Sequence, residues 1–301
     1  NDERRRAALG GKTAATEKGE FNSPLQYGLT GFAKAYGGFG ANTSTHAATG
    51  YDFGGVGLLS GVGYKFAPEL ELGALIGYSY NHADLYRDLG EATDNVIRLG
   101  AYGNWQWDNF YFNTAPTFGI HIQNTERNIT FMKQTAKADN TGFDFAWYNR
   151  FGYTFELPQK FFITPSYALG MAYLHNPSYT ETGAAAALKV NAYDNWSLTQ
   201  NLEVRVGKLF QISDRFALLP EIWGGWEHEY LSANDVTMRF AAAQNVAWSA
   251  PVTRIAADRA VFGAGLTTLI SNKYELFGRY NQRLWDGGHS ATFTVGIGVK
   301  F

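Results

Sequence analysis

Residues 291–301, at the end of the chain, read ATFTVGIGVKF. Every second side chain is apolar, in the series Ala291, Phe293, Val295, Ile297, Val299 and Phe301. A strict period of two predicts a β-strand with one apolar face. The opposite face carries threonine, glycine and one lysine, instead of the Lys/Glu-rich surface of a soluble sheet. Such a strand suits a position with lipid on one side and water on the other.

The composition narrows the class of protein. The chain has 301 residues, of which 45% are hydrophobic and 17% are charged, whereas about a quarter of residues are charged in soluble domains. No apolar run reaches the roughly 18 residues that a transmembrane helix needs. The net charge of -2 argues against a nucleic-acid partner. The absence of cysteine excludes disulfides and thiolate metal sites.

The terminal pattern recurs through most of the chain. We count twelve alternating runs, at residues 27–40, 51–66, 69–83, 95–107, 109–123, 141–157, 160–174, 196–212, 215–230, 259–271, 273–285 and 289–301. The spacers at 67–68, 108, 158–159, 213–214 and 272 are one or two residues long, whereas those at 41–50, 84–94, 124–140, 175–195 and 231–258 have ten or more. Short turns that alternate with long loops are typical of an up-and-down barrel in the outer membrane.

The apolar faces of twelve strands cannot all point inward, because side chains would not fill so wide a lumen. They must therefore point outward into lipid, and closure of the barrel pairs every backbone group, as hydrocarbon requires. We predict an all-β fold: a 12-stranded antiparallel transmembrane β-barrel over residues 27–301. It would lie in the bacterial outer membrane, with the long loops extracellular and both ends of the barrel periplasmic.

Residues 1–26 break the alternation and contain strong helix formers in the stretch DERRRAAL. We expect a linker with a helix inside the lumen, where inward carboxylates would hold Arg4, Arg5 and Arg6. A disordered periplasmic tail is the alternative.

Strand parity also predicts the residues that line the pore. These candidates are Glu71, Arg98, Asp144, Arg150, Glu156, Glu203, Arg205, Glu221, Glu227, Glu275, Arg279 and Arg283. Their mixed charge suits a lumen filled by a polar segment, since a selective porin would concentrate one sign at its constriction. A 12-stranded channel for small solutes remains the alternative function. The inward glycines would leave room for a helix or a translocating chain.

No residue pattern indicates an active site or a cofactor. The six histidines are scattered, and the run EHEY at 227–230 sends neighbouring side chains to opposite faces, which cannot assemble a compact metal site. His289, Ser290 and Asn281 hint at a barrel phospholipase, but adjacent strand residues point apart. We therefore expect no catalytic residue, no metal and no cofactor.

The order of several segments resembles the C-terminal translocator β-domain of the monomeric autotransporters, known as type Va secretion. The segments are a polar N-terminal linker, GLTGFAKAYGGFG at 28–40, GGVGLLSGVGYKF at 54–66, LELGALIGYSYNHADL at 70–85, FFITPSYALGMAYL at 161–174, VTMRFAAAQNVAWSAP at 236–251 and a terminal aromatic strand. The resemblance covers essentially the whole chain.

The resemblance implies a function and a set of partners. The barrel would anchor and help to export its own N-terminal passenger, as a monomer in contact with lipid and lipopolysaccharide. Periplasmic chaperones and the barrel assembly machinery would bring it to the membrane. That machinery would read the terminal strand, with Phe293, Val295, Ile297, Val299 and Phe301, as the outer-membrane sorting signal. Some family members cut their linker inside the barrel after an asparagine, so Asn1 makes self-cleavage a further, weaker expectation.

Overall fold

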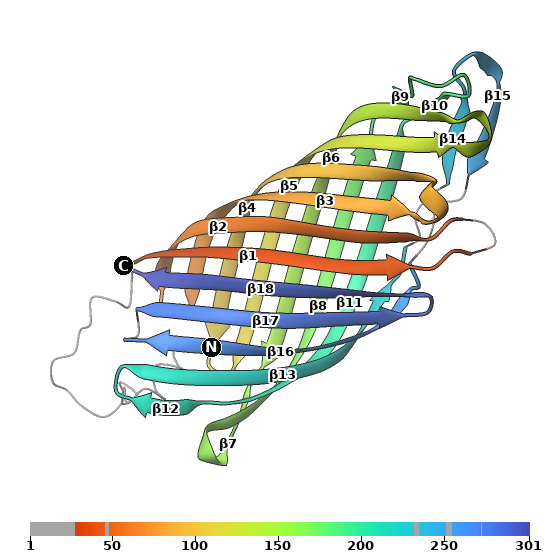
Figure 1. The fold of residues 1–301 in the computed structure, drawn as a ribbon. Helices are drawn as coiled ribbons and strands as arrows, with labels where there is room; N and C mark the ends of the chain where they lie inside the picture. Colours follow the sequence, from red (N-terminus) through yellow and green to blue (C-terminus); the bar gives the residue numbers. More distant parts are fainter. Residues whose placement is uncertain (1–27, 46–47, 232–234, 251–254, 272) are drawn as a thin grey trace.

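The fold is a tall, tilted β-barrel in the computed structural model (Figure 1). The structure describes residues 28–45, 48–231, 235–250, 255–271 and 273–301. The expected helix at 1–26 lies outside these residues. Within them, no helix has the length and apolar character needed to cross a membrane.

Fourteen described strands form the main sheet. They are β1 (Gly28–Asn42), β2 (Tyr51–Ala67), β3 (Leu70–Leu85), β4 (Gly90–Trp107), β5 (Phe110–Ile129), β6 (Gln134–Tyr153), β7 (Phe155–Leu157), β8 (Phe161–Asn176), β11 (Tyr193–Lys208), β12 (Phe210–Ser213), β13 (Phe216–Glu229), β16 (Asp258–Ile270), β17 (Tyr274–Trp285) and β18 (Gly288–Lys300). β7 prolongs β6 after a break at Thr154, and β12 prolongs β11 after a break at Leu209. Twelve strands therefore span the wall described here.

The wall is closed and antiparallel. β18 pairs with β17 on one side and with β1 on the other, in a register that places Thr30 opposite Lys300. β11 closes the remaining gap between β8 and β13. Every wall strand thus has two neighbours, which satisfies its backbone groups without water. The predicted fold class is confirmed.

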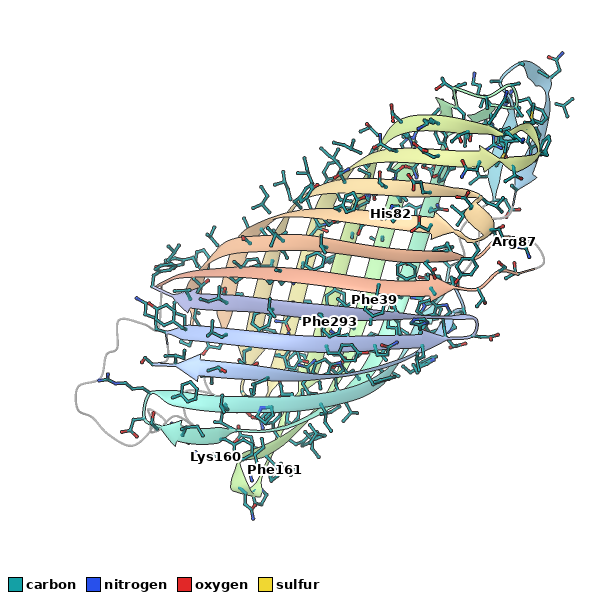
Figure 2. All side chains as sticks on the ribbon, viewed as in Figure 1. Phe39, His82, Arg87, Lys160, Phe161 and Phe293 are labelled. Atoms are coloured by element: carbon teal, nitrogen blue, oxygen red, sulfur yellow. The ribbon has the colours of Figure 1, made fainter. Side chains whose placement is uncertain are left out.

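The apolar set lies on the outer face, as predicted. On the terminal strand Phe293 is 53% exposed, Val295 60% and Ile297 37%. Figure 2 shows Phe39 and Phe293 projecting from the outside of the barrel. Outward aromatic pairs such as Trp105 with Trp107 gather near strand ends, where amphipathic rings suit a membrane interface.

The two rims of the barrel differ, although less than expected. At one rim, hereafter the short-turn end, connections consist of a few residues, including the 3-10 helix η3 (Pro158–Lys160). At the opposite rim, hereafter the loop end, the prediction of long loops at 84–94 and 124–140 is wrong. Strands continue there up to η1 (Tyr86–Asp88) and η2 (Thr130–Met132). Polar side chains occur on both faces of these strand ends, so the alternation that marks a strand in lipid is lost from the sequence.

A second, four-stranded sheet stands at the loop end (Figure 1). It is built from the two longest loops, as β9 (Tyr179–Thr180), β10 (Leu188–Val190), β14 (Val236–Phe240) and β15 (Ala243–Ala250). Paired backbone hydrogen bonds between Lys137 and Thr182 join it to the barrel wall.

A partly buried ion pair holds this sheet on the rim. Arg127, at the end of β5, donates to both carboxylate oxygens of Glu181, at 3.0 and 2.5 Å, and to the Ala186 carbonyl at 2.9 Å. Burial raises the pKa of the nearby Tyr179 hydroxyl to about 12, and the charge of Arg127 opposes that rise. Neither loop predicts from its own residues that the two would meet here.

Candidate functional site in the barrel lumen

The lumen is polar, and its charges are organised by strand parity. Glycine 119 on β5 lies between Arg98 on β4 and Asp144 on β6 in the strand register. Because glycine has no side chain, Arg98 reaches across it and donates two hydrogen bonds to Asp144, at 2.8 and 2.7 Å. A Cβ atom on Gly119 would stand 2.2 Å from an Asp144 oxygen. The glycine is therefore required for this bidentate pair.

His121 extends the same cluster along the wall. Its Nε2 lies 2.6 Å from an Asp144 oxygen, and its Nδ1 lies 2.8 Å from an Asp94 oxygen. Only the protonated imidazole donates at both nitrogens, so the contacts favour the cationic ring. Sequence reasoning missed this residue as a site member, because Asp94 fell outside the predicted strand.

A second charge network joins β6, β11 and β13. Glu203 accepts from Arg150 at 2.9 Å and from Arg205 at 3.1 Å. Arg205 also lies 3.6 Å from Glu221, and its guanidinium stacks 4.4 Å above the Trp223 ring. These two arginines and two glutamates balance one another, so this part of the wall presents little net charge to the lumen.

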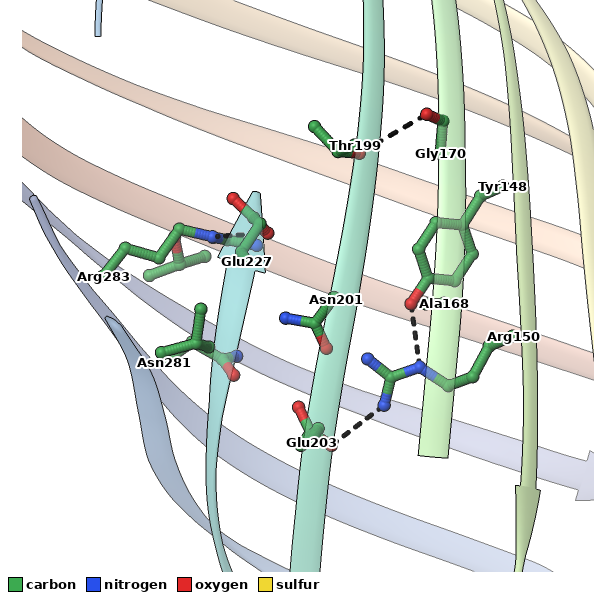
Figure 3. Close-up of a pocket in the computed structure, with 12 residues that line it drawn as sticks. Tyr148, Arg150, Ala168, Gly170, Thr199, Asn201, Glu203, Glu227, Asn281 and Arg283 are labelled. Carbon is green, nitrogen blue, oxygen red and sulfur yellow. Dashed lines mark hydrogen bonds and ion pairs between the residues drawn. The ribbon is translucent and has the colours of Figure 1, made fainter. Parts of the chain in front are cut away.

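Nearer the loop end, Glu227 forms a third group. It accepts from Arg259 at 2.9 Å and from Arg283 at 3.4 Å. Figure 3 shows Arg283 turned toward Glu227, with Asn201 and Asn281 below them. Asn201 is 9% exposed, and its side-chain oxygen has no hydrogen-bond partner among the described residues. These side chains border a cavity of about 250 Å³ at the waist of the lumen.

A larger cavity of about 650 Å³ opens toward the short-turn end. Seven cationic side chains border it against four acidic ones, an excess of three positive charges. The cations are Lys34, Lys65, Arg150, Arg205, Lys273, Arg279 and Lys300, and the acids are Glu69, Glu71, Glu221 and Glu275. We call this space the basic vestibule.

Aromatic side chains occupy the room that many inward glycines leave. The Tyr102 ring lies across Gly73, where a Cβ would come within 2.4 Å of it, and its hydroxyl lies over Gly63 on the next strand. That hydroxyl donates to Glu71 at 3.2 Å, and Thr30 donates to the same carboxylate at 2.7 Å. Gly73 was expected to leave room for a helix or a translocating chain, but it instead lets a large ring lie flat on the wall.

The predicted pore-lining residues fall into three sets. Arg98 with Asp144, Arg150 with Glu203, Arg205 and Glu221, and Arg283 with Glu227 meet in ion pairs, while Glu71, Glu275 and Arg279 border the basic vestibule. Glu156 lies on β7 at the short-turn end and is exposed.

Histidine and carboxylate side chains also gather outside the lumen. His82, Asp84 and Glu91 lie close together at the loop end, and this is the one group of that kind among the described residues. His82 Nε2 is 2.9 Å from Asp84, and the two acids are exposed. An exposed ion pair with one further acid does not make a metal site.

Comparisons with known proteins identify the kind of barrel. Residues 31–281 match the family model described as autotransporter beta-domain. Two extracellular serine proteases of Serratia marcescens are 24% and 23% identical over 99% of this chain. The chain spans only 28% of the length of these curated relatives, so their protease name describes much longer proteins.

Solved structures agree on the fold. The translocator domain of autotransporter NalP from Neisseria meningitidis superposes with a TM-score of 0.73 at 16% identity, over 99% of this chain and 94% of that one. The beta domain of the Bordetella autotransporter BrkA gives 0.70 at 18% identity, over 91% of this chain and all of the other. At such identities the likeness shows the architecture alone. Because the family model matches most of the chain, this outer-membrane barrel belongs to the autotransporter beta-domain family.

Proposed function

We propose that this barrel anchors a passenger polypeptide in the outer membrane and helps to export it to the cell surface, with the passenger joined ahead of residue 1. The observation that carries the proposal is the family match over residues 31–281 on a closed twelve-stranded wall. The long loops would then face the outside of the cell, and the short turns would face the periplasm.

The lumen suits a passing polypeptide. The charged groups at its waist are engaged with one another across the wall, as in the contacts of Glu203 with Arg150 and of Glu227 with Arg283. At the waist, a chain in transit therefore meets polar surface without a strong field of one sign. Selective channels instead concentrate one charge at a constriction, which makes solute conduction the weaker reading.

We further propose that residues 1–26 form a separate linker segment that lies in the lumen in the resting state. The inward carboxylates are poor partners for its three arginines, Arg4, Arg5 and Arg6. An arginine or histidine of the wall already contacts each of Asp144, Glu203, Glu221 and Glu227. Glu17 and Glu20, closer to the first strand, would instead enter the basic vestibule. Opposite charges then hold the segment at the periplasmic mouth.

Assembly would depend on the terminal strand. Phe301 is 63% exposed, and its backbone N–H donates to Leu29 at 3.0 Å, at the seam where β18 meets β1. We propose that periplasmic chaperones and the barrel assembly machinery recognise this strand before the seam closes. The outer face would then meet lipid and, around the loop end, lipopolysaccharide.

The proposed function contains no enzymatic step. Cleavage of the linker at Asn1 would need a carboxyl group that is free to polarise the asparagine. The four buried acids named above each contact a cation instead, and no observation on the described residues favours self-cleavage.

A surface-display fusion tests export. A reporter domain placed between a signal peptide and residues 1–301 should become accessible to protease added to intact cells. The same fusion ending at residue 287, which lacks β18 and cannot close the wall, should keep the reporter inside. A correctly folded full barrel whose reporter remains protected would contradict the proposal.

Conductance in planar bilayers tests the linker. Removal of residues 1–26 should raise single-channel conductance several-fold, because the plug is gone. Replacement of Glu17 and Glu20 by glutamine should give intermittent opening. Equal conductance of the intact and shortened chains would refute a lumen position for the segment, and a large, steady pore in the intact chain would favour the channel.

A further inference from the structure

A lysine occupies the lipid-facing side of the barrel near the short-turn end. Lys208 is the last residue of β11, in the same outward series as Val204 and Val206, which are 49% and 36% exposed. Its Nζ lies 4.4 Å from the centre of the Phe161 ring and 5.2 Å from that of Phe210. The ammonium group is therefore held between two aromatic rings.

Apolar side chains lie on both sides of this ammonium along the wall. Phe161 stands directly opposite it on β8, and Leu157 on β7 stands opposite Phe161. Toward the rim, Ile212 is 61% exposed on the next stretch of the same strand pair. A lone cation in an apolar, lipid-facing band is unfavourable unless an anion accompanies it.

The rings satisfy only part of the ammonium. A lysine carries three N–H donors, and the ammonium group of Lys208 makes no hydrogen bond or ion pair within the described chain; it contacts the two rings. Its donors are therefore available to a ligand on the outer face.

A second lysine lies in the adjoining turn. Lys160 ends the turn η3, immediately before Phe161, and Figure 2 shows both residues at this end of the barrel. Its carbonyl accepts the Leu209 N–H at 3.0 Å, which ties the turn to the residue after Lys208. The neighbouring acid on β7, Glu156, pairs with Phe162 and so belongs to the inward series, away from the lipid.

We propose that Lys208 binds the phosphodiester group of a membrane phospholipid in the leaflet at the short-turn end. Phe161 and Phe210 would pack against the glycerol and the first methylenes of the acyl chains. A cation held in this apolar band favours a lipid with a net negative charge over a zwitterionic one. This lipid site lies outside the lumen and is independent of any passenger.

Native mass spectrometry of the folded barrel tests the site, with phosphatidylglycerol added to the detergent solution. Wild type should retain one lipid at low lipid concentration, and Lys208→Gln should weaken that binding about fivefold, the factor expected for one lysine near an anionic surface. Lys208→Arg should keep the binding. Lys133→Gln, which removes the same charge from the turn at the loop end, should also bind as wild type.

Two further comparisons define the ligand. Diacylglycerol lacks the phosphate, so it should bind to wild type and to every variant equally. Excess inorganic phosphate should leave the bound phosphatidylglycerol in place. Unchanged lipid binding by Lys208→Gln, or an equal loss in Lys133→Gln, would overturn the proposal. Displacement of the lipid by inorganic phosphate would also overturn the proposal, because it would show a site for a free anion and not for a lipid. Heat-modifiable migration on gels checks that each variant is folded, and none of these outcomes bears on passenger export.

Discussion

Replacement of Val295 by lysine probes the solvent that meets the outer wall. Val295 lies in the middle of β18, 60% exposed and opposite Ala35 and Gly278 on the adjacent strands. Neither neighbour offers a carboxylate. A Cβ on Gly278 would meet no atom within 4 Å, so the added side chain faces open surroundings and not a packed protein neighbour.

The expected cost follows from the depth of the site. Val295 is five residues from the end of β18 at Lys300, or ~17 Å along the strand at roughly 3.3 Å per residue. A lysine side chain is too short to carry its charge over that distance. A lysine on the lipid face near the bilayer midplane costs about 2–4 kcal/mol in transmembrane barrels. We therefore expect Val295→Lys to shift the unfolding equilibrium by roughly a hundredfold, since 1.4 kcal/mol is a factor of ten.

Equilibrium unfolding in guanidinium, with the barrel in lipid vesicles, measures the effect through tryptophan fluorescence, for which the chain has eight reporters. Thr292→Lys is the matched control, because Thr292 lies on the same strand and borders the cavity at the waist of the lumen. It should cost less than about 1 kcal/mol, as a lumen-facing substitution meets water. Equal free energies of unfolding for the two variants would refute the assignment of the faces.

Three smaller perturbations test other parts of the structure. Phe301→Ser should reduce the heat-modifiable fraction recovered from outer membranes, and a wild-type fraction would count against the terminal strand as a sorting signal. Arg127→Ala leaves the buried Glu181 without its counter-charge, and because Arg127 is 38% exposed the cost should fall below the roughly 3–5 kcal/mol of a fully buried pair; rapid proteolysis within 177–192 is expected, and wild-type resistance would remove the ion pair as the anchor of the four-stranded sheet. Gly119→Ala places a methyl group against the Asp144 carboxylate and should lower the unfolding midpoint. Gly224→Ala is the control, because a Cβ there has nothing within 4 Å, and it should leave the midpoint unchanged. Equal midpoints for the two variants would show that the pair of Arg98 and Asp144 adapts to the methyl group.

The wall of the barrel could be predicted closely from the sequence, because lipid on one side and water on the other impose a strict period of two. The runs predicted at 51–66 and 273–285 differ by one residue at one end from β2 and β17. The prediction of strand ends failed at the loop end, where the strands no longer have lipid on one side and water on the other. Residues 124–128 continue β5 beyond the apolar band, with polar side chains on both faces.

Contacts between distant segments could be predicted least. Parity placed Asp144 and Arg98 correctly on the lumen side, but the pair depends on Gly119 lying between them, which requires the register of three strands. The sheet at the loop end joins residues 179–190 to 236–250, and neither loop reveals its partner by itself. For Lys208, strand parity predicts the outward position of the side chain, but its two aromatic neighbours could not be predicted from the sequence.

Single-cysteine labelling along β18 shows which solvent each face of the wall meets, because the chain has no cysteine. One cysteine would be placed in turn at each of residues 292–295, and the folded barrel in vesicles would be treated with a water-soluble maleimide and, separately, with a lipid-soluble one. We expect alternation: 292 and 294 react from water, and 293 and 295 react only from the hydrocarbon. Labelling of all four positions by the water-soluble reagent would contradict a barrel whose apolar face meets lipid.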